Sequence, residues 1–326
     1  IKVLDRSQII ALANCIVLGG SGIVEARSLV DGSVQWSANV KGTARGLAYS
    51  AGRLLVSTDT GSLYCFSNLP AKVKIVSQKN DKKKLAPLNL AKRLAELART
   101  KHGWALVTDL VDGSLCASLA EKTQLNIIGV SDDLQKVTLA RKNLAKYGVY
   151  GNRVSISFIS SDKFPFTDYF ANLIVSEGAL LGKNKSHLAS DEWKRMLQPY
   201  NGVVWLHPDE KPYISKGLAG AGEWTHQYGN PANTSNSGDT LVQSDLVLQW
   251  FGGPGAAPMV DRHLRAPAPL AAKGKLIIPG ENILITLDAY NGTELWRLPL
   301  PDSQRYSMPY DAGYMSVNES QLCVAV

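Results

Sequence analysis

The sequence predicts a mixed fold in which antiparallel β segments flank a central α/β segment. Short strand-like runs separated by glycine turns occur near both ends, and helix-like and strand-like runs alternate between residues 71 and 213. That middle stretch holds 22 Lys and Arg against 14 Asp and Glu, a net +8, whereas the other residues together give −1. Such an asymmetry is typical of a domain boundary, so we expect three parts, 1–70, 71–213 and 214–326.

Composition narrows the class of protein. The 326 residues are 45% hydrophobic and 19% charged, as in an ordinary globular chain, and no apolar run reaches the roughly 18 residues that a membrane-spanning helix needs. The four cysteines form no Cys-x-x-Cys pair, and no metal site is predicted. The one dense basic run, Lys79–Lys84, is not interleaved with aromatic residues, which disfavours nucleic-acid binding.

The first part predicts an antiparallel sheet. Dipeptides such as Asp31-Gly32 and Thr60-Gly61 separate its strand-like runs, and Asp-Gly favours tight hairpins because both turn positions accept positive φ. The expected strands are 23–29, 33–38, 53–57 and 62–66.

The same hairpin pattern returns near the C-terminus. The run Asp31-Gly32-Ser33-Val34-Gln35-Trp36 matches Asn291-Gly292-Thr293-Glu294-Leu295-Trp296 in a turn-forming residue, a glycine, a hydroxyl residue and a tryptophan. Two chance hairpins would also explain the match, but the number of shared positions favours an internal repeat.

This Gly-x-x-x-Trp element resembles the blades of pyrroloquinoline-quinone-like (PQQ-like) β-propellers. At about 40–45 residues a blade, the flanking parts make roughly four blades, so the resemblance implies an incomplete propeller whose remaining blades come from another chain or segment. Many such propellers are exported, so an exported or periplasmic location is expected. Quinone-dependent members often carry an adjacent cysteine pair that this chain lacks, which argues against bound PQQ.

In the middle part, apolar strands alternate with amphipathic helices, which predicts a parallel, Rossmann-like sheet with helices on both faces. The expected helices are 88–99, 114–122, 133–147 and 191–197, and the expected strands are 104–107, 125–130, 154–159, 171–176 and 202–206.

This order resembles a class I S-adenosylmethionine (SAM)-dependent methyltransferase domain inserted between propeller blades. The resemblance implies an acidic residue and two glycines in the turn after the first strand. Asp109 and Gly113 fit that pattern, but Val111 replaces the first glycine, and a β-branched residue is poorly suited to positive φ or to close approach of a ligand.

The resemblance implies four further candidate residues beyond that turn. Ser131 aligns with the acidic residue that binds the ribose hydroxyls, and Asp132 substitutes if the turn shifts by one residue; alternatively, Asp132 and Asp133 cap the following helix. Asp162 fits the adenine position. Glu177, after the fourth strand, is the candidate general base, although a plain loop carboxylate would look the same.

Three functions follow. The altered turn favours a propeller scaffold whose degenerate methyltransferase-like insert serves protein interaction or assembly. The alternative is an active SAM-dependent methyltransferase whose propeller selects the substrate, and a quinone-dependent oxidoreductase ranks third. SAM is a cytosolic metabolite, so an exported chain would lack it, which also favours the scaffold.

Overall fold

The computed structural model describes residues 6–68, 88–160, 163–243, 245–259, 268–301, 303, 315–318 and 320–325. The chain divides into two compact units, Ile1–Lys79 and Asn80–Val326, which are described separately below. The second unit contains both the α/β part and the C-terminal β part. No helix in the described part of the chain is both long and apolar enough to cross a membrane.

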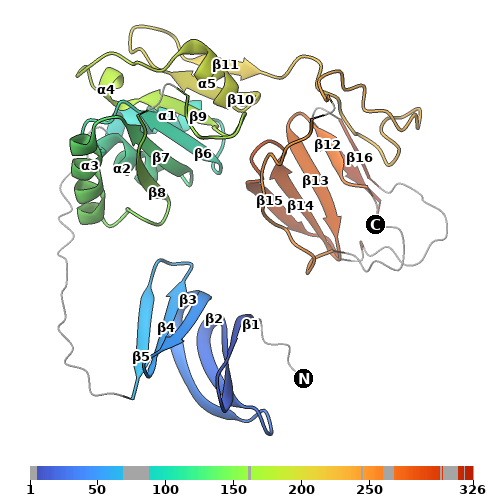
Figure 1. Ribbon diagram of the computed structural model, residues 1–326. Helices are drawn as coiled ribbons and strands as arrows, with labels where there is room; N and C mark the ends of the chain where they lie inside the picture. The colour runs from blue at the N-terminus through green and yellow to red at the C-terminus, as the bar shows by residue number, and fades with distance from the viewer. Residues whose placement is uncertain are drawn as a thin grey trace. The chain divides into compact units, whose positions relative to one another are not determined.

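The first unit is one antiparallel meander in which the strands pair in chain order (Figure 1). Two of its strands are longer than expected, and shifts of pairing register between Ser21 and Ile23 and between Ala44 and Gly46 interrupt them, which is typical of a bend in a sheet. Its core includes Val24, Val40 and Val56. The strands are β1 (Arg6–Ala11), β2 (Cys15–Ser28), β3 (Val34–Ser50), β4 (Arg53–Thr58) and β5 (Leu63–Ser67).

The α/β part has the layered sheet that the alternating pattern predicts. Its six strands run in the order β11-β10-β9-β6-β7-β8, with β6 to β10 parallel and β11 antiparallel at the edge. The first five strands in chain order therefore lie 3-2-1-4-5, the doubly wound arrangement, with its switch point between β6 and β9. The strands are β6 (Trp104–Thr108), β7 (Asn126–Ser131), β8 (Val154–Phe158), β9 (Leu173–Ser176), β10 (Tyr200–Trp205) and β11 (Tyr213–Lys216).

Helices cover both faces of this sheet, and the strands contribute side chains alternately to two cores. Ala105 and Val107 of β6 belong to the core that holds α1, α2 and α3, whereas Leu106 belongs to the core that holds Met196 of α5. The helices are α1 (Leu88–Leu97), α2 (Ser114–Lys122), α3 (Leu134–Tyr147), α4 (Glu177–Leu180) and α5 (Ser190–Met196). Each helix expected from the sequence is present, with ends that differ by two residues or fewer.

The C-terminal β part is smaller than the expected set of blades. One antiparallel sheet pairs in chain order, and a separate two-stranded ladder lies beside its first strand in the core. Residues 246–251, a mostly apolar run, have no regular secondary structure, and Phe251 is 93% exposed. The described residues of the two β parts form no closed propeller. The strands are β12 (Leu270–Ala272), β13 (Lys275–Gly280), β14 (Ile283–Asp288), β15 (Glu294–Pro299), β16 (Met315–Val317) and β17 (Leu322–Val324).

The two matching segments form hairpins of the same geometry. Trp36 pairs with Ala26 and Trp296 pairs with Thr286, and in both hairpins the register shifts at the next position toward the turn. The turn glycines, Gly32 and Gly292, have φ of 71° and 70°. In each turn the glycine N–H donates to the last residue of the preceding strand, and the side chain at Asp31 or Asn291 accepts a backbone N–H two residues on. Equal spacing in the sequence therefore corresponds to the same local structure.

Within the second unit, the C-terminal β part docks on the amino ends of the parallel strands. Asn172, 6% exposed and just before β9, accepts the N–H of Trp104 at 2.9 Å and donates to the carboxylate of Asp288 at 3.2 Å. Asn291 donates to the carbonyl of Phe170 at 2.9 Å and to the side chain of Asn172 at 3.1 Å. One buried amide therefore connects the two layers.

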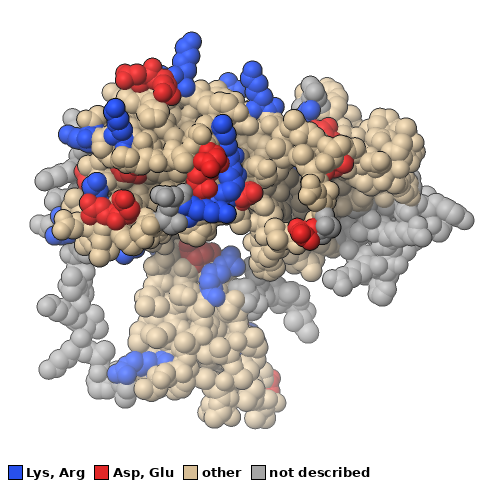
Figure 2. All heavy atoms as spheres, turned by 45° about the horizontal axis from the view of Figure 1, so that its top comes forward, with Lys and Arg blue, Asp and Glu red and all other residues tan. Residues whose placement is uncertain are grey.

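Charges are mixed over the surface. Among the side chains coloured on the face shown in Figure 2, Lys and Arg lie interspersed with Asp and Glu, without one continuous basic area.

We expect Asn172→Ala to lower the free energy of unfolding by about 1–3 kcal/mol, because it leaves buried donors and acceptors without partners. Unfolding in urea, followed by tryptophan fluorescence, measures the change. Asn152→Ala, in the exposed turn before β8, is the control and is expected to stay within about 0.5 kcal/mol of the wild type. Equal effects of the two substitutions would show that Asn172 does not hold the layers together.

Candidate functional site

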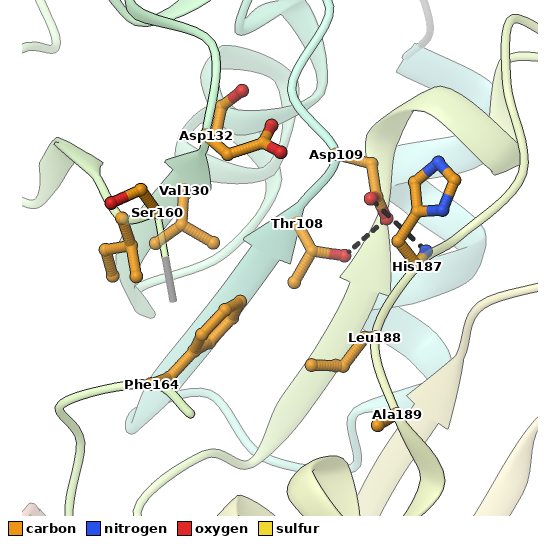
Figure 3. A pocket seen from close by; sticks show the side chains of 11 residues that line it. Thr108, Asp109, Val130, Asp132, Ser160, Phe164, His187, Leu188 and Ala189 are labelled. Carbon is orange, nitrogen blue, oxygen red and sulfur yellow. Dashed lines mark hydrogen bonds between the residues drawn. The ribbon is translucent and has the colours of Figure 1, made fainter. Parts of the chain in front are cut away.

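A pocket of about 620 Å³ lies at the carboxyl ends of β6, β7 and β8, beside the switch point of the sheet (Figure 3). Ligands bind at this edge in doubly wound sheets because the loops diverge on either side of the switch point. Its lining combines apolar side chains with two carboxylates, hydroxyl groups and one imidazole: Thr108, Asp109, Val130, Ser131, Asp132, Ile159, Ser160, Phe164, His187, Leu188 and Ala189.

Asp109 stands at the end of β6, on the pocket wall. Its φ is 50°, a left-handed conformation that is uncommon for a residue other than glycine and that often accompanies functional sites. The carboxylate accepts the hydroxyl of Thr108 at 2.8 Å and the backbone N–H of His187 at 3.4 Å. Figure 3 shows the imidazole of His187 beside this carboxylate. The contact ties the end of β6 to the segment that closes one side of the pocket.

The two neighbouring aspartates after β7, Asp132 and Asp133, have different surroundings. Asp133 is the N-cap of α3 and accepts the N–H groups of Gln135 at 2.8 Å and Lys136 at 3.3 Å. Ser131 is 8% exposed, lines the pocket and accepts the N–H of Asp133 at 3.1 Å. Asp132 is exposed, lines the pocket and makes no side-chain hydrogen bond within the described residues. The capping alternative therefore holds for Asp133 and leaves the carboxylate of Asp132 available to a ligand.

The turn after β6 does not force Val111 into the positive φ that its place in the family pattern suggested. Positive φ occurs at Asp109 and at Gly113, where φ is 78°, but not at Val111. Gly113 does not line the pocket. A β-carbon there would stand 3.0 Å from that of Ala140, so this glycine lets the turn pack against α3. The objection that a β-branched residue cannot adopt the required φ does not apply to this chain.

Glu177 also lies away from the pocket lining. Its side chain is fully buried and accepts four backbone N–H groups, from Val111 at 2.6 Å, Asp112 at 3.3 Å, Gly113 at 3.1 Å and Leu115 at 2.8 Å. Burial raises the pKa of this carboxyl group, although the N–H groups act in the opposite direction. Glu177 therefore accepts the backbone N–H groups at the N-terminus of α2 and does not face a substrate as a base would.

The structure adds residues that the sequence did not single out. Thr108 is the last residue of β6, one residue beyond the expected strand 104–107. Phe164 and His187 lie in segments with no periodic pattern, so spacing could not have found them. Asp162, the expected adenine contact, lies outside the described residues. No group of three or more His, Cys, Asp or Glu that could hold a metal ion occurs within the described ranges.

Replacing Glu177 with Gln should lower the free energy of unfolding by about 2–3 kcal/mol, because the amide NH₂ must face at least one of the backbone N–H groups. Urea unfolding followed by circular dichroism measures this loss. Glu121→Gln, on an exposed position of α2, is the matched control and should change stability by no more than about 0.5 kcal/mol. If the two variants unfold alike, the carboxylate does not hold this turn.

Comparison with protein-family models finds no match for this chain, and comparison with curated proteins finds none either. Solved structures resemble its α/β part. A protein of Methanococcus maripaludis, provisionally assigned as a SAM-dependent methyltransferase, is 20% identical with a TM-score of 0.33 over 41% of this chain and 66% of its own. A SAM-dependent methyltransferase of Aquifex aeolicus is 17% identical with a TM-score of 0.31 over 40% of this chain and 71% of its own.

The [4+2]-cyclase SpnF is 19% identical, with a TM-score of 0.29 over 36% of this chain and 43% of its own. Similarity at these values carries no argument about activity, because one fold hosts many reactions. The order and direction of the strands described above make residues 88–216 a doubly wound α/β fold.

Proposed function

We propose that the α/β part binds S-adenosylmethionine in the pocket at the carboxyl ends of β6 to β8 and acts as a SAM-dependent methyltransferase. The observation that supports this most directly is the position of two carboxylates, Asp109 and Asp132, at the ends of adjacent strands on one pocket beside the switch point.

The chemistry of the pocket suits the cofactor. Its volume of about 620 Å³ falls in the range of about 300–1,000 Å³ that is usual for small-molecule sites. Ser131 aligns with the acidic residue that binds the ribose hydroxyls in the family, and the next residue, Asp132, brings an exposed carboxylate to the same pocket. Ile159, Phe164 and Val130 offer apolar surface for an adenine ring.

Asp109 would face the positively charged methionine end of the cofactor. Bound SAM supplies an electrophilic methyl group on a cationic sulfur, and a carboxylate nearby favours that charge. The N–H groups of residues 111–113 and 115 all donate to Glu177, and that of Ser114 donates to Asp112 at 3.0 Å. Recognition in this proposal therefore relies on side chains, with Glu177 as the residue that positions the turn.

A non-catalytic binding or assembly module is the second candidate. The same internal hydrogen bonds favour it, since they leave no N–H group between residues 111 and 115 free to bind a carboxylate of the ligand. The two candidates differ in whether the folded chain binds SAM.

Isothermal titration calorimetry of the full chain with SAM and with S-adenosylhomocysteine tests the proposal. We expect one site, and we expect Asp132→Ala to weaken binding about tenfold or more, since a hydrogen bond to a charged group contributes about 1.5–3 kcal/mol. Asp133→Ala is the matched control: it removes the cap of α3, costs about 1 kcal/mol of stability, and should leave the affinity unchanged.

Absence of binding by a folded wild-type chain at millimolar ligand would reject cofactor binding and favour the assembly module. Binding that Asp133→Ala weakens as much as Asp132→Ala would contradict the assigned ribose contact.

A further inference from the structure

The connection between β8 and β9 carries one wall of the pocket. Residues 159–160 and 163–172 of this connection are described and contain no helix. In the segment 163–172, Phe164 lines the pocket, and Tyr169 and Phe170 approach the amino end of β9. This segment, called the wall loop below, therefore runs from the carboxyl edge of the sheet to the amino edge (Figure 1). A loop without a hydrogen-bonded ladder needs other contacts to hold an aromatic side chain in one place.

Two residues of α5 supply those contacts. The carboxylate of Glu192 accepts the N–H of Phe164 at 2.7 Å, and the guanidinium of Arg195 donates to the carbonyl of Phe164 at 3.0 Å. Arg195 also donates to the carbonyl of Phe166 at 2.7 Å and to the carboxylate of Asp168 at 2.8 Å. Both backbone groups of the pocket residue Phe164 are thus bonded to one ion pair.

The ion pair between Arg195 and Glu192 is held by two hydrogen bonds and is largely buried. Arg195 donates through Nε to Glu192 at 3.0 Å and through Nη2 at 2.7 Å, which is a bidentate contact. The Glu192 side chain is 9% exposed and that of Arg195 is 21% exposed. The hydrogen bond to Arg195 lowers the pKa of Glu192, and the hydrogen bond to Glu192 raises the pKa of Arg195. Both groups are therefore charged at neutral pH.

The far end of the wall loop also contacts the C-terminal β part. The side-chain amide of Gln249 donates to the carbonyl of Asp168 and, at 3.2 Å, to that of Tyr290. The rings of Tyr169 and Tyr290 meet at 5.5 Å between centroids. Arg195 contributes at this end too, since its carbonyl accepts the N–H of Tyr169 at 2.8 Å. At the pocket end, the backbone groups of Phe164 are bonded by Glu192 and Arg195.

We propose that Arg195 and Glu192 are positioning residues that hold Phe164 as the apolar wall against the adenine of the bound ligand. This inference rests on the proposed function, since it takes an adenine nucleoside as the ligand of the pocket. Lysine cannot replace Arg195, because a single ammonium group cannot reach two carbonyl groups and two carboxylates in one plane.

The test is calorimetry of the full chain with S-adenosylhomocysteine and with adenosine. Arg195→Lys should weaken both ligands about fivefold or more, the effect expected when an aromatic contact of about 1 kcal/mol is lost. Phe164→Ala should weaken both at least as much. In the double variant, Arg195→Lys should have no further effect, because Arg195 acts through Phe164.

Arg297→Lys is the matched control. Arg297 and Glu294 form the same kind of pair three residues apart, with Nε at 3.0 Å and Nη2 at 2.8 Å from the carboxylate, on β15 and away from the pocket lining. It should leave both affinities within twofold of the wild type. Glu192→Gln, which disturbs the same clamp without removing Arg195, replaces Arg195→Lys if that variant does not fold.

The outcomes separate the two proposals. Failure of the wild type to bind either ligand would reject the proposed function. Wild-type binding that Arg195→Lys leaves unchanged, or additive losses in the double variant, would overturn the positioning role while leaving the proposed function intact.

Discussion

The buried carboxylate of Glu177 is the contact on which the α/β site depends. A helix begins with backbone N–H groups that have no partner within the helix, and the turn before α2 adds more of them. Glu177, which follows β9, accepts four of these N–H groups from residues 62 to 66 positions earlier in the chain. The side chain therefore joins the two strands that flank the switch point. Asp109, two residues before the first of these N–H groups, lines the pocket, whereas Glu177 does not.

The two edges of the parallel sheet serve different purposes. The carboxyl edge opens into the pocket, whereas residues at the amino edge, Asn172 and Tyr200 among them, meet the C-terminal β part. Burial of Asp288, at 3% exposed, raises the pKa of its carboxyl group against the hydrogen bonds that it accepts from neighbours such as Tyr290 and Asn172. The wall loop extends between the two edges, so a single segment contributes both to the pocket and to the docked β part.

The repeated hairpin separates what the local sequence determines, the turn itself, from what tertiary contacts determine, the residues around the turn. Both copies form the same turn with the same pairing register. Their surroundings differ: the ring of Trp250 lies against Gly292 and its indole N–H donates to the carbonyl of Ala289, whereas a β-carbon at Gly32 would meet no atom within 4 Å. The turn sequence therefore forms the same hairpin whether or not another side chain packs on it. For that reason, the two hairpins by themselves predict neither a propeller blade nor a closed ring of blades.

Sequence alone determined the local structure and the general place of the site. Periodicity, caps and turn glycines predicted the helices and most strands of the α/β part, because these signals act within a few residues. The resemblance to the methyltransferase family also named Asp109, Ser131 and Asp132 as candidate ligand contacts, and all three line the pocket. Only the tertiary structure decided which aspartate caps α3, that Glu177 points inward to backbone groups, and that Arg195 holds Phe164. Each of these depends on contacts between residues distant in the chain, or on the direction of a side chain, which spacing does not encode.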